Sequence, residues 1–381
     1  MRLMRLIKAK ALPLFLCLTL SLSLSGCGVF GGSKSSAAQQ DADYSSSADA
    51  SETNAPIQLP DSTPEISPQI PDFGTSSETT AVTTLPIYMQ EADFTWKPYV
   101  MSQIYADLYG DKFTSDFQSM VTAFLNYEST FPCSSSEEAD QINTAAASCF
   151  PLLNMDVFYI TYDETQNIGV LDYIWPQEDH MAGIKSFEDS ITQFITSCVK
   201  KSDNELTAAM ALYMAYSSRI TYDYAALGDE TTIDLSSYRG LTEYAGICQT
   251  FGPAYAYLCL ETGIDAVTAG GLSTEKTAHE WTLVKLDGEY YYMDTTWQNG
   301  DGGAGLTYFG LTSQERESAG NFTISVINIG DTNVIWGDDI KVDSERFFSL
   351  HYAVYASFNT DRTQVDCIGN DGSQWTFPLE T

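Results

Sequence analysis

The sequence predicts an α+β protein, and three patterns in its second half support that prediction. Residues 202–219 combine a helix start signal with apolar side chains spaced three and four apart. Short runs rich in β-branched and aromatic residues predict three strands, at 265–270, 279–286 and 289–294. From about Phe322 onward, apolar and polar residues alternate, which is typical of further strands.

The first 26 residues have the pattern of a secretory signal peptide. Four basic residues and no acid precede an apolar run at 11–24, which is too short to cross roughly 30 Å of hydrocarbon. The letters LSGC at 24–27 resemble the bacterial lipobox. That resemblance implies a lipid on Cys27 and an exported protein held at the outer face of the bacterial cell membrane. The alternative is an ordinary signal peptide cut near Gly26, with Cys27 unmodified.

Residues 27–88 are mainly Ser, Thr, Ala, Pro and acidic residues, so we predict a disordered tether. Removing residues 1–26 takes away four of the 18 basic residues and none of the 51 acidic ones. The net charge therefore changes from −33 to −37. Such a charge argues against nucleic acid as a partner, because phosphate binding rests on clusters of Lys and Arg. It also argues against flat docking onto anionic lipid, so membrane contact is expected only through Cys27.

Residues 89–201 are predicted to form a mixed α/β region without chemistry of its own. Apolar residues recur at helical spacing in 113–125 and in 187–198. Residues 157–162 and 168–175 are predicted to pair as a hairpin. We interpret these stripes as core packing.

Residues 202–320 are predicted to form the core that carries the chemistry, followed by a β-rich region at 321–381. Ser202 and Glu205 have the spacing of a capping box, and the first helix is expected to end near Arg219. A second helix is expected from about Cys248 to Gly263, where glycine suits the C-cap. Because proline is tolerated only in a first turn, Pro253 predicts that regular helix begins after Gln249.

A histidine and an acid are expected to face each other across a hairpin. The Asp287-Gly288 dipeptide is a strong two-residue turn signal. It pairs Leu286 with Glu289 and, counting back, Trp281 with Asp294. His279 then lies on the same face as Trp281, diagonal to Asp294 and within reach of its side chain. A carboxylate in that place would fix the imidazole tautomer and stabilise its charged form.

Cys248 completes a pattern that thiol acyl-transfer enzymes need. It opens a predicted helix, whose N-terminal amides and dipole favour the thiolate, as does a neighbouring imidazolium. Nucleophile, base and orienting acid are then Cys248, His279 and Asp294. Taken singly, each has an ordinary structural explanation, such as a small buried Cys. The geometry shared by the three favours the catalytic interpretation. The backbone amide of Cys248 is expected to supply one oxyanion donor, and the second donor stays open.

These residues carry a resemblance to the transglutaminase-like superfamily. The matching motifs are GICQTF at 246–251, AHEW at 278–281 and YMDTTW at 292–297, with supporting segments at 220–224, 238–241 and 308–312. The resemblance implies a papain-like core in which a Cys-bearing helix packs on an antiparallel sheet. It implies Cys248 as nucleophile, His279 as base and Asp294 as orienter. We expect Trp281 and Trp297 to be packing residues, but the resemblance also implies that they lie near the cleft, where they are candidates for contact with substrate.

The functional hypothesis is thiol-dependent acyl chemistry on a peptide or protein amide outside the membrane, with the cell wall as one location for the substrate. Hydrolysis is favoured slightly over crosslinking to an amine. The alternative is a cell-surface binding or scaffold protein that uses the same fold without turnover. No cofactor and no metal are expected. The pairing of the six cysteines beyond Cys27, the substrate, the role of residues 89–201 and the oligomeric state stay open.

Overall fold

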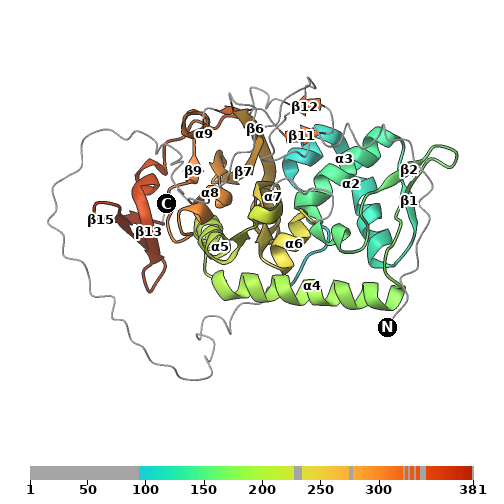
Figure 1. Ribbon diagram of the computed structural model, residues 1–381, viewed down its shortest axis with the longest axis horizontal. Helices are drawn as coiled ribbons and strands as arrows, with labels where there is room; N and C mark the ends of the chain where they lie inside the picture. The colour runs from blue at the N-terminus through green and yellow to red at the C-terminus, as the bar shows by residue number, and fades with distance from the viewer. Residues whose placement is uncertain are drawn as a thin grey trace, which may run out of the picture.

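The computed structural model describes residues 94–226, 234–273, 278–320, 322–324, 327–329, 332–334 and 340–379. Their architecture is α+β, as predicted. A helical region, a central sheet with its helices, and a small C-terminal sheet follow one another along the long axis of the molecule (Figure 1). The predicted signal segment, Cys27 and the predicted tether at 27–88 lie outside the described residues. Within the described ranges, no helix is both long and apolar enough to cross a membrane.

The central sheet has the strand order β10-β6-β7-β8-β9, and every neighbouring pair is antiparallel. Its strands are β6 (Ala266–Ser273), β7 (Ala278–Leu286), β8 (Glu289–Met293), β9 (Phe309–Leu311) and β10 (Phe322–Ile324). The β7–β8 register runs from Leu286↔Glu289 to Thr282↔Met293, which confirms the predicted turn. Asp287 and Gly288 both have positive φ, 51° and 87°, as a type I′ turn requires.

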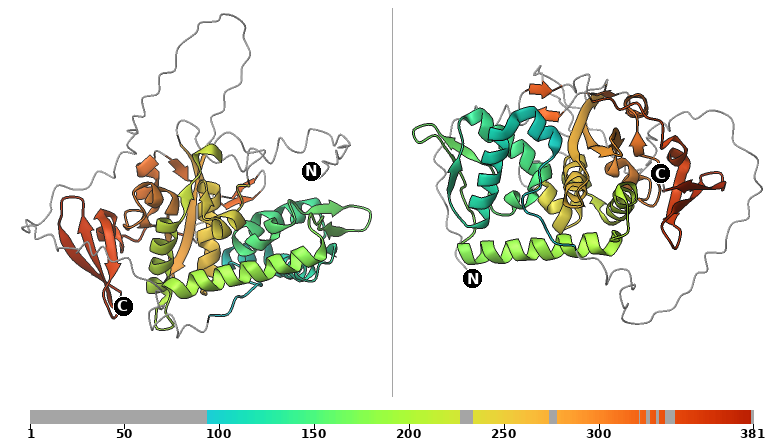
Figure 2. Two further views of the ribbon diagram at one scale, coloured as in Figure 1. Left: turned by 60° about the horizontal axis from the view of Figure 1, so that its bottom comes forward. Right: turned by 180° about the vertical axis from the view of Figure 1, so that it is seen from behind.

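Helix α7 (Cys248–Glu261) packs on the face of this sheet, between α5 and the helical region (Figures 1 and 2). The helix ends as predicted, with Gly263 at φ 89° just past its last residue. The expectation that regular helix begins only after Gln249 is wrong, because the helix is continuous from Cys248 with Pro253 inside it. Next to Pro253, Gly252 O accepts a hydrogen bond from Thr282 Oγ1 of β7 at 2.8 Å, which ties this part of the helix to the sheet.

Helix α5 (Glu205–Arg219) lies beside α7 and ends where the sequence predicts. Its N-cap is Asn204, whose side chain accepts from Thr207 N at 2.8 Å, so the predicted Ser202 cap is wrong. Asp203 bonds back to Lys200 and closes a turn that leaves Ser202 outside the helix. The surrounding short elements are β4 (Thr221–Tyr222), η3 (Tyr224–Ala226), α6 (Ser237–Thr242), β5 (Ala245–Gly246) and α8 (Thr295–Gly300).

The N-terminal region contains the two predicted helical stripes and the predicted hairpin. Its elements are α2 (Gln103–Leu125), β1 (Thr130–Pro132), α3 (Ser136–Cys149), η2 (Pro151–Met155), β2 (Thr161–Asp163), β3 (Ile168–Val170) and α4 (Gln177–Cys198). The hairpin is shorter than expected and gains β1 as a third strand, in the order β1-β3-β2. The long helix α4 runs along one side of the molecule, from this region to α5 (Figure 2).

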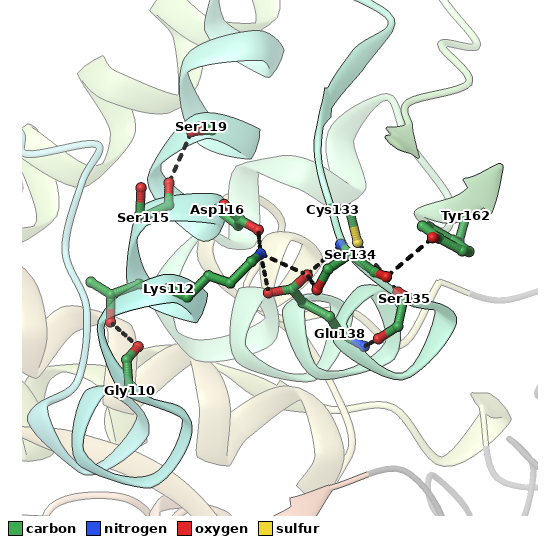
Figure 3. A network of polar contacts seen from close by, with 11 residues as sticks. Gly110, Lys112, Ser115, Asp116, Ser119, Cys133, Ser134, Ser135, Glu138 and Tyr162 are labelled. Carbon is green, nitrogen blue, oxygen red and sulfur yellow. Dashed lines mark hydrogen bonds and ion pairs between the residues drawn. The ribbon is translucent and has the colours of Figure 1, made fainter. Parts of the chain in front are cut away.

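A surface network ties the helices of this region together (Figure 3). Lys112 of α2 contacts Asp116 and also reaches Glu138 of α3, whose carboxylate accepts from Ser134 N at 2.6 Å. The Lys112 side chain is 63% exposed, so each of these ion pairs is worth at most about 1 kcal/mol. We interpret the network as a structural connection between α2 and α3.

A strap at residues 94–103 fastens this region to the far end of α7. Trp96 Nε1 donates to Tyr257 Oη at 2.7 Å, and Lys97 N donates to Glu261 Oε2 at 3.1 Å. Ser102 donates to Asp265 Oδ1 at 2.6 Å, just beyond the helix. The helix that begins at Cys248 is therefore anchored at its opposite end by residues that come more than 160 positions before their partners in the chain.

The remaining elements confirm the prediction of strands beyond Phe322. They are α9 (Ser313–Gly320), β11 (Ile327–Ile329), β12 (Thr332–Val334), η4 (Phe348–Tyr352), β13 (Ala353–Phe358), β14 (Gln364–Gly369) and β15 (Gln374–Pro378). β13, β14 and β15 form the small sheet at the C-terminal end of the molecule (Figure 1). β10, the first strand of the predicted β-rich region, lies at the edge of the central sheet beside β6.

Candidate active site

His279 and Asp294 meet across the β7–β8 hairpin. Strand β8 ends at Met293, and Asp294 is the N-cap of α8. Its Oδ1 accepts from Trp297 N at 3.0 Å, while its Oδ2 lies 2.7 Å from His279 Nε2. One carboxylate thus caps a helix with one oxygen and orients the imidazole with the other.

Asp294 remains ionised in spite of its complete burial. Desolvation raises its pKa, but the charges of His279 and Arg316 and the hydrogen bonds to its oxygens outweigh that effect, so the pKa of Asp294 lies below its ordinary value. The backbone of Asp294 is also held in place, since Tyr213 Oη donates to Asp294 O at 3.1 Å. The acid is therefore both charged and immobile, which suits an orienting role.

Cys248 is buried at the first position of α7, beside the strand that bears His279. Gly252, one turn further along the helix, has no side chain where it meets strand β7 at Trp281. A Cβ at Gly252 would lie 3.0 Å from Trp281 O, and Thr282 Oγ1 donates to Gly252 O at 2.8 Å. The contact between Gly252 and Trp281 lies one helix turn from Cys248 and two residues from His279.

The segments before Cys248 hold its helix start. β4 pairs with β5 in parallel, with Tyr222 opposite Gly246. A Cβ at Gly246 would lie 2.4 Å from Thr250 Cβ, so only glycine allows this approach. Ile247 N donates to Thr250 Oγ1 at 3.3 Å and shares in capping the first turn.

Arg316 is a site residue that the sequence analysis missed. Its side chain is fully buried, and NH2 lies 3.1 Å from Asp294 Oδ2, the same oxygen that binds His279. Its guanidinium carbon lies 3.9 Å from the ring centre of Trp297 and 4.4 Å from that of Trp281. The surrounding sequence SQERESAG has no apolar face, so it gave no sign of a buried cation.

Trp281 and Trp297 pack against the imidazole as well as against Arg316. The Trp297 ring is stacked on His279 with ring centres 5.2 Å apart, and the Trp281 ring lies at 5.8 Å. Trp281 is fully buried and Trp297 partly so. Both tryptophans therefore pack beside His279, and their contact with substrate stays a prediction.

The other five cysteines are thiols in the structure: Cys133, Cys149, Cys198, Cys259 and Cys367. Burial raises the pKa of Cys133, and it raises those of Cys149, Cys198, Cys259 and Cys367 to about 12. These thiols are thus poor nucleophiles at neutral pH. Among the described residues, no group of three or more His, Cys, Asp or Glu side chains is arranged to hold a metal ion.

Comparisons with known proteins match only part of the chain. No curated protein matched the sequence. A candidate cysteine protease from Cytophaga hutchinsonii is 20% identical over 30% of this chain and 37% of its own, with a TM-score of 0.24. A TGase structure is 19% identical over 32% of this chain and 34% of its own, with a TM-score of 0.25.

The chain thus spans only about a third of each of these structures, and TM-scores this low carry no inference about fold or activity. The segment with the thiol, the imidazole and the carboxylate gives the more specific result. Residues 192–295, which include Cys248, His279 and Asp294, match the sequence model of the transglutaminase-like superfamily.

Proposed function

We propose that this chain is a thiol-dependent enzyme that performs acyl chemistry on peptide or protein amides. Cys248 is the nucleophile, His279 the base and Asp294 the orienting acid. The observation that supports this most directly is the buried contact of 2.7 Å between His279 Nε2 and Asp294 Oδ2, beside the helix that begins with Cys248. The match of residues 192–295 to the transglutaminase-like superfamily agrees with this assignment.

The two ring nitrogens of His279 have different tasks in this proposal. Because Nε2 of His279 faces Asp294, proton exchange with the thiol falls to Nδ1. Cys248 Sγ attacks the amide carbonyl carbon, and a C–S bond forms as the tetrahedral intermediate develops. His279 then gives the thiol proton to the leaving amine, the C–N bond breaks, and a thioester remains on Cys248.

The fate of that thioester decides between two activities. Attack by water gives hydrolysis, as in a peptidase or deamidase, whereas attack by a Lys or another amine gives a crosslink. We favour hydrolysis, since water needs no binding surface of its own. Incubation of a peptide substrate with a labelled primary amine separates the two, because only crosslinking transfers the label.

We further propose that the enzyme acts outside the membrane, anchored through a lipid on Cys27. The signal-like segment 1–26 and the LSGC letters at 24–27 support this location. The substrate would then be an extracellular or cell-wall peptide or protein. Cys27→Ser expressed in a bacterial host, followed by membrane fractionation, tests the anchor, since loss of the lipid releases the exported protein.

Selective alkylation tests the enzyme assignment. The purified full chain is treated with iodoacetamide at about pH 6, and the labelled sites are assigned by mass spectrometry. The five other cysteines serve as internal references, because burial raises their pKa values. We expect Cys248 to react fastest, and His279→Ala to remove that advantage.

The same experiment distinguishes the non-catalytic alternative. If Cys248 reacts no faster than the reference cysteines in folded protein, the enzyme assignment fails and a binding or scaffold role takes its place. A Cys248→Ala variant then supplies the second comparison. An enzyme loses its activity in this variant, whereas a scaffold keeps its binding.

A further inference from the structure

We propose that Arg316 is a positioning residue of this site, whose charge fixes Asp294 and sets the pH range in which the Cys248–His279 pair reacts. The inference rests on the proposed function, and it assigns a task to a residue beyond the Cys-His-Asp set. It also gives the C-terminal region a role, because that region holds the helix that carries Arg316.

The geometry places two basic side chains, His279 and Arg316, on one carboxylate oxygen. Asp294 Oδ2 lies 2.7 Å from His279 Nε2 and 3.1 Å from Arg316 NH2. The Arg316 and Asp294 side chains have no exposed surface, and His279 is 4% exposed. Little water can screen these charges, so each of them acts strongly on its neighbours.

The indole rings fix the orientation of the guanidinium. Its carbon lies within 4.4 Å of the ring centres of both Trp281 and Trp297, the rings that also pack against His279. A planar cation fits the faces of aromatic rings better than an ammonium does. Arg316, His279 and Asp294 are thus parts of one packed cluster.

Charge balance explains what a buried cation adds to this cluster. With Arg316 present, the charges of thiolate, imidazolium, carboxylate and guanidinium add to zero. Without it, the buried cluster carries one net negative charge in the reactive form and in the neutral thiol form alike. An excess negative charge raises the proton affinity of every nearby group. Both the thiol and the imidazolium would then lose their protons at higher pH.

The helix that carries Arg316 is held from the C-terminal region. α9 is short, so its position depends on tertiary contacts. Glu315 Oε2 accepts from Thr312 N at 2.8 Å, and Glu315 Oε1 lies 3.2 Å from His351 Nδ1. Ser313 N donates to Val342 O at 2.7 Å. Residues 342–351 therefore set the place of the first turn, in which Arg316 lies.

Few groups near Arg316 change charge around neutral pH. The ionisable groups that face it or lie at the start of its helix are Asp294, His279, Cys248, Tyr213, Tyr308, Glu315 and His351. Burial raises the pKa values of Tyr213 and Tyr308 well above neutrality, so both stay uncharged. The steps that Arg316 influences between about pH 4 and 9 are therefore those of Cys248 and His279.

The test is the pH dependence of Cys248 alkylation in the full chain. Arg316→Met fills the space between the indole rings without a charge, and Arg316→Lys keeps a charge without the planar fork. We expect the titration steps of the labelling rate to move to higher pH by about one to three units in R316M. In R316K they should stay within about half a unit of their original positions.

Arg362→Gln is the matched control. Arg362 is 10% exposed and pairs with buried Asp203 at 2.8 Å, so R362Q also removes a guanidinium from a shielded ion pair. Because Arg362 contacts Cys198 O and the Phe358 ring rather than the triad residues, its loss should lower stability and leave the Cys248 steps in place. Circular dichroism verifies that every variant compared is folded.

The outcomes separate this inference from the proposed function. If Cys248 is not activated in the unaltered chain, the proposed function fails. If it is activated and folded R316M keeps the original steps, only the role of Arg316 is overturned. Should R316M not fold, R316K decides alone. If R316K keeps the original titration steps of the labelling rate, the charge argument is supported. If the steps in R316K move to higher pH by as much as is expected for R316M, the charge argument is overturned.

Discussion

A Cβ added to Gly252 would lie 3.0 Å from the carbonyl oxygen of Trp281. The helix that presents Cys248 and the strand that presents His279 are therefore in backbone contact. This contact lies one helix turn from Cys248 and two residues from His279. The absence of a side chain at Gly252 sets the spacing of these two elements.

Gly252→Ala tests this close approach. Alanine in a helix interior normally gains about 1 kcal/mol over glycine, but here the added methyl must push α7 away from β7. We expect a net loss of about 1–3 kcal/mol in unfolding free energy and slower alkylation of Cys248, measured by denaturant titration and labelling. Gly300→Ala is the control, since nothing lies within 4 Å of its Cβ. Equal stability of the two variants would contradict this account.

Asp294→Asn separates helix capping from orientation of the imidazole. Asparagine keeps an oxygen for Trp297 N, but its amide group replaces the oxygen shared by His279 and Arg316. Because the buried ion pair between Asp294 and Arg316 is lost, we expect a loss of about 3–5 kcal/mol in stability. Alkylation of Cys248 at about pH 6 should also fall at least about tenfold, because the imidazole loses its fixed tautomer.

Asp203→Asn is the matched control for that substitution, as Asp203 is buried in an ion pair with Arg362. It should destabilise the protein while leaving Cys248 reactivity in the folded state unchanged. Slower labelling in D203N equal to that in D294N would mean that general loosening, rather than the lost carboxylate, slows the thiol.

The positions of His279 and Asp294 followed from the sequence because a two-residue turn fixes the register of a hairpin. Once Asp287 and Gly288 are accepted as the turn, every cross-strand neighbour is determined. Helices α2, α4 and α5 were likewise predictable from apolar stripes, since burial on one face has a period that the sequence displays. These features are local, so no long-range contact needs to be known.

Arg316 and the N-cap Asn204 were not predictable for different reasons. The burial of Arg316 arises from Trp281, Trp297 and Asp294, which come 19 or more positions earlier, while its own segment has the composition of a solvated helix. Ser202 and Asn204 lie two positions apart, and both residue types are common at helix N-caps. The turn closed by Asp203 decided between them, and that turn is tied to Arg362.

Glu261 should make stability depend on pH at the strap. Burial raises its pKa from 4.5 to about 7, more than the hydrogen bonds from Tyr257 and Lys97 lower it. The folded chain then keeps a proton on Glu261 between about pH 4.5 and 7, where the unfolded chain has lost it. Stability from this group is thus fully present below about pH 4.5 and lost as the pH rises towards 7.

Glu261→Gln removes this dependence, because the amide resembles the protonated acid at every pH. Between pH 5 and 8, the unfolding free energy of the variant should rise relative to that of the unaltered chain by up to about 3 kcal/mol, measured by thermal unfolding. Asp189→Asn, which removes an exposed partner of Lys185, is a control that should show no such trend. A constant difference between E261Q and the unaltered chain would show that Glu261 is ionised throughout.

His351→Gln should loosen the helix start that carries Arg316. The ion pair with His351 and the hydrogen bonds from Thr312 outweigh the effect of burial and hold the pKa of Glu315 below 4.5. Glu315 therefore stabilises the fold above about pH 4.5, and this contribution is lost as the pH falls through the lowered pKa of Glu315.

We expect H351Q to lower the unfolding free energy by about 1–2 kcal/mol at pH 6. The difference should narrow at lower pH, where Glu315 is protonated in both proteins. Thermal unfolding at several pH values measures this, and a cost that stays constant down to pH 3 would mean that His351 acts through packing instead of through Glu315.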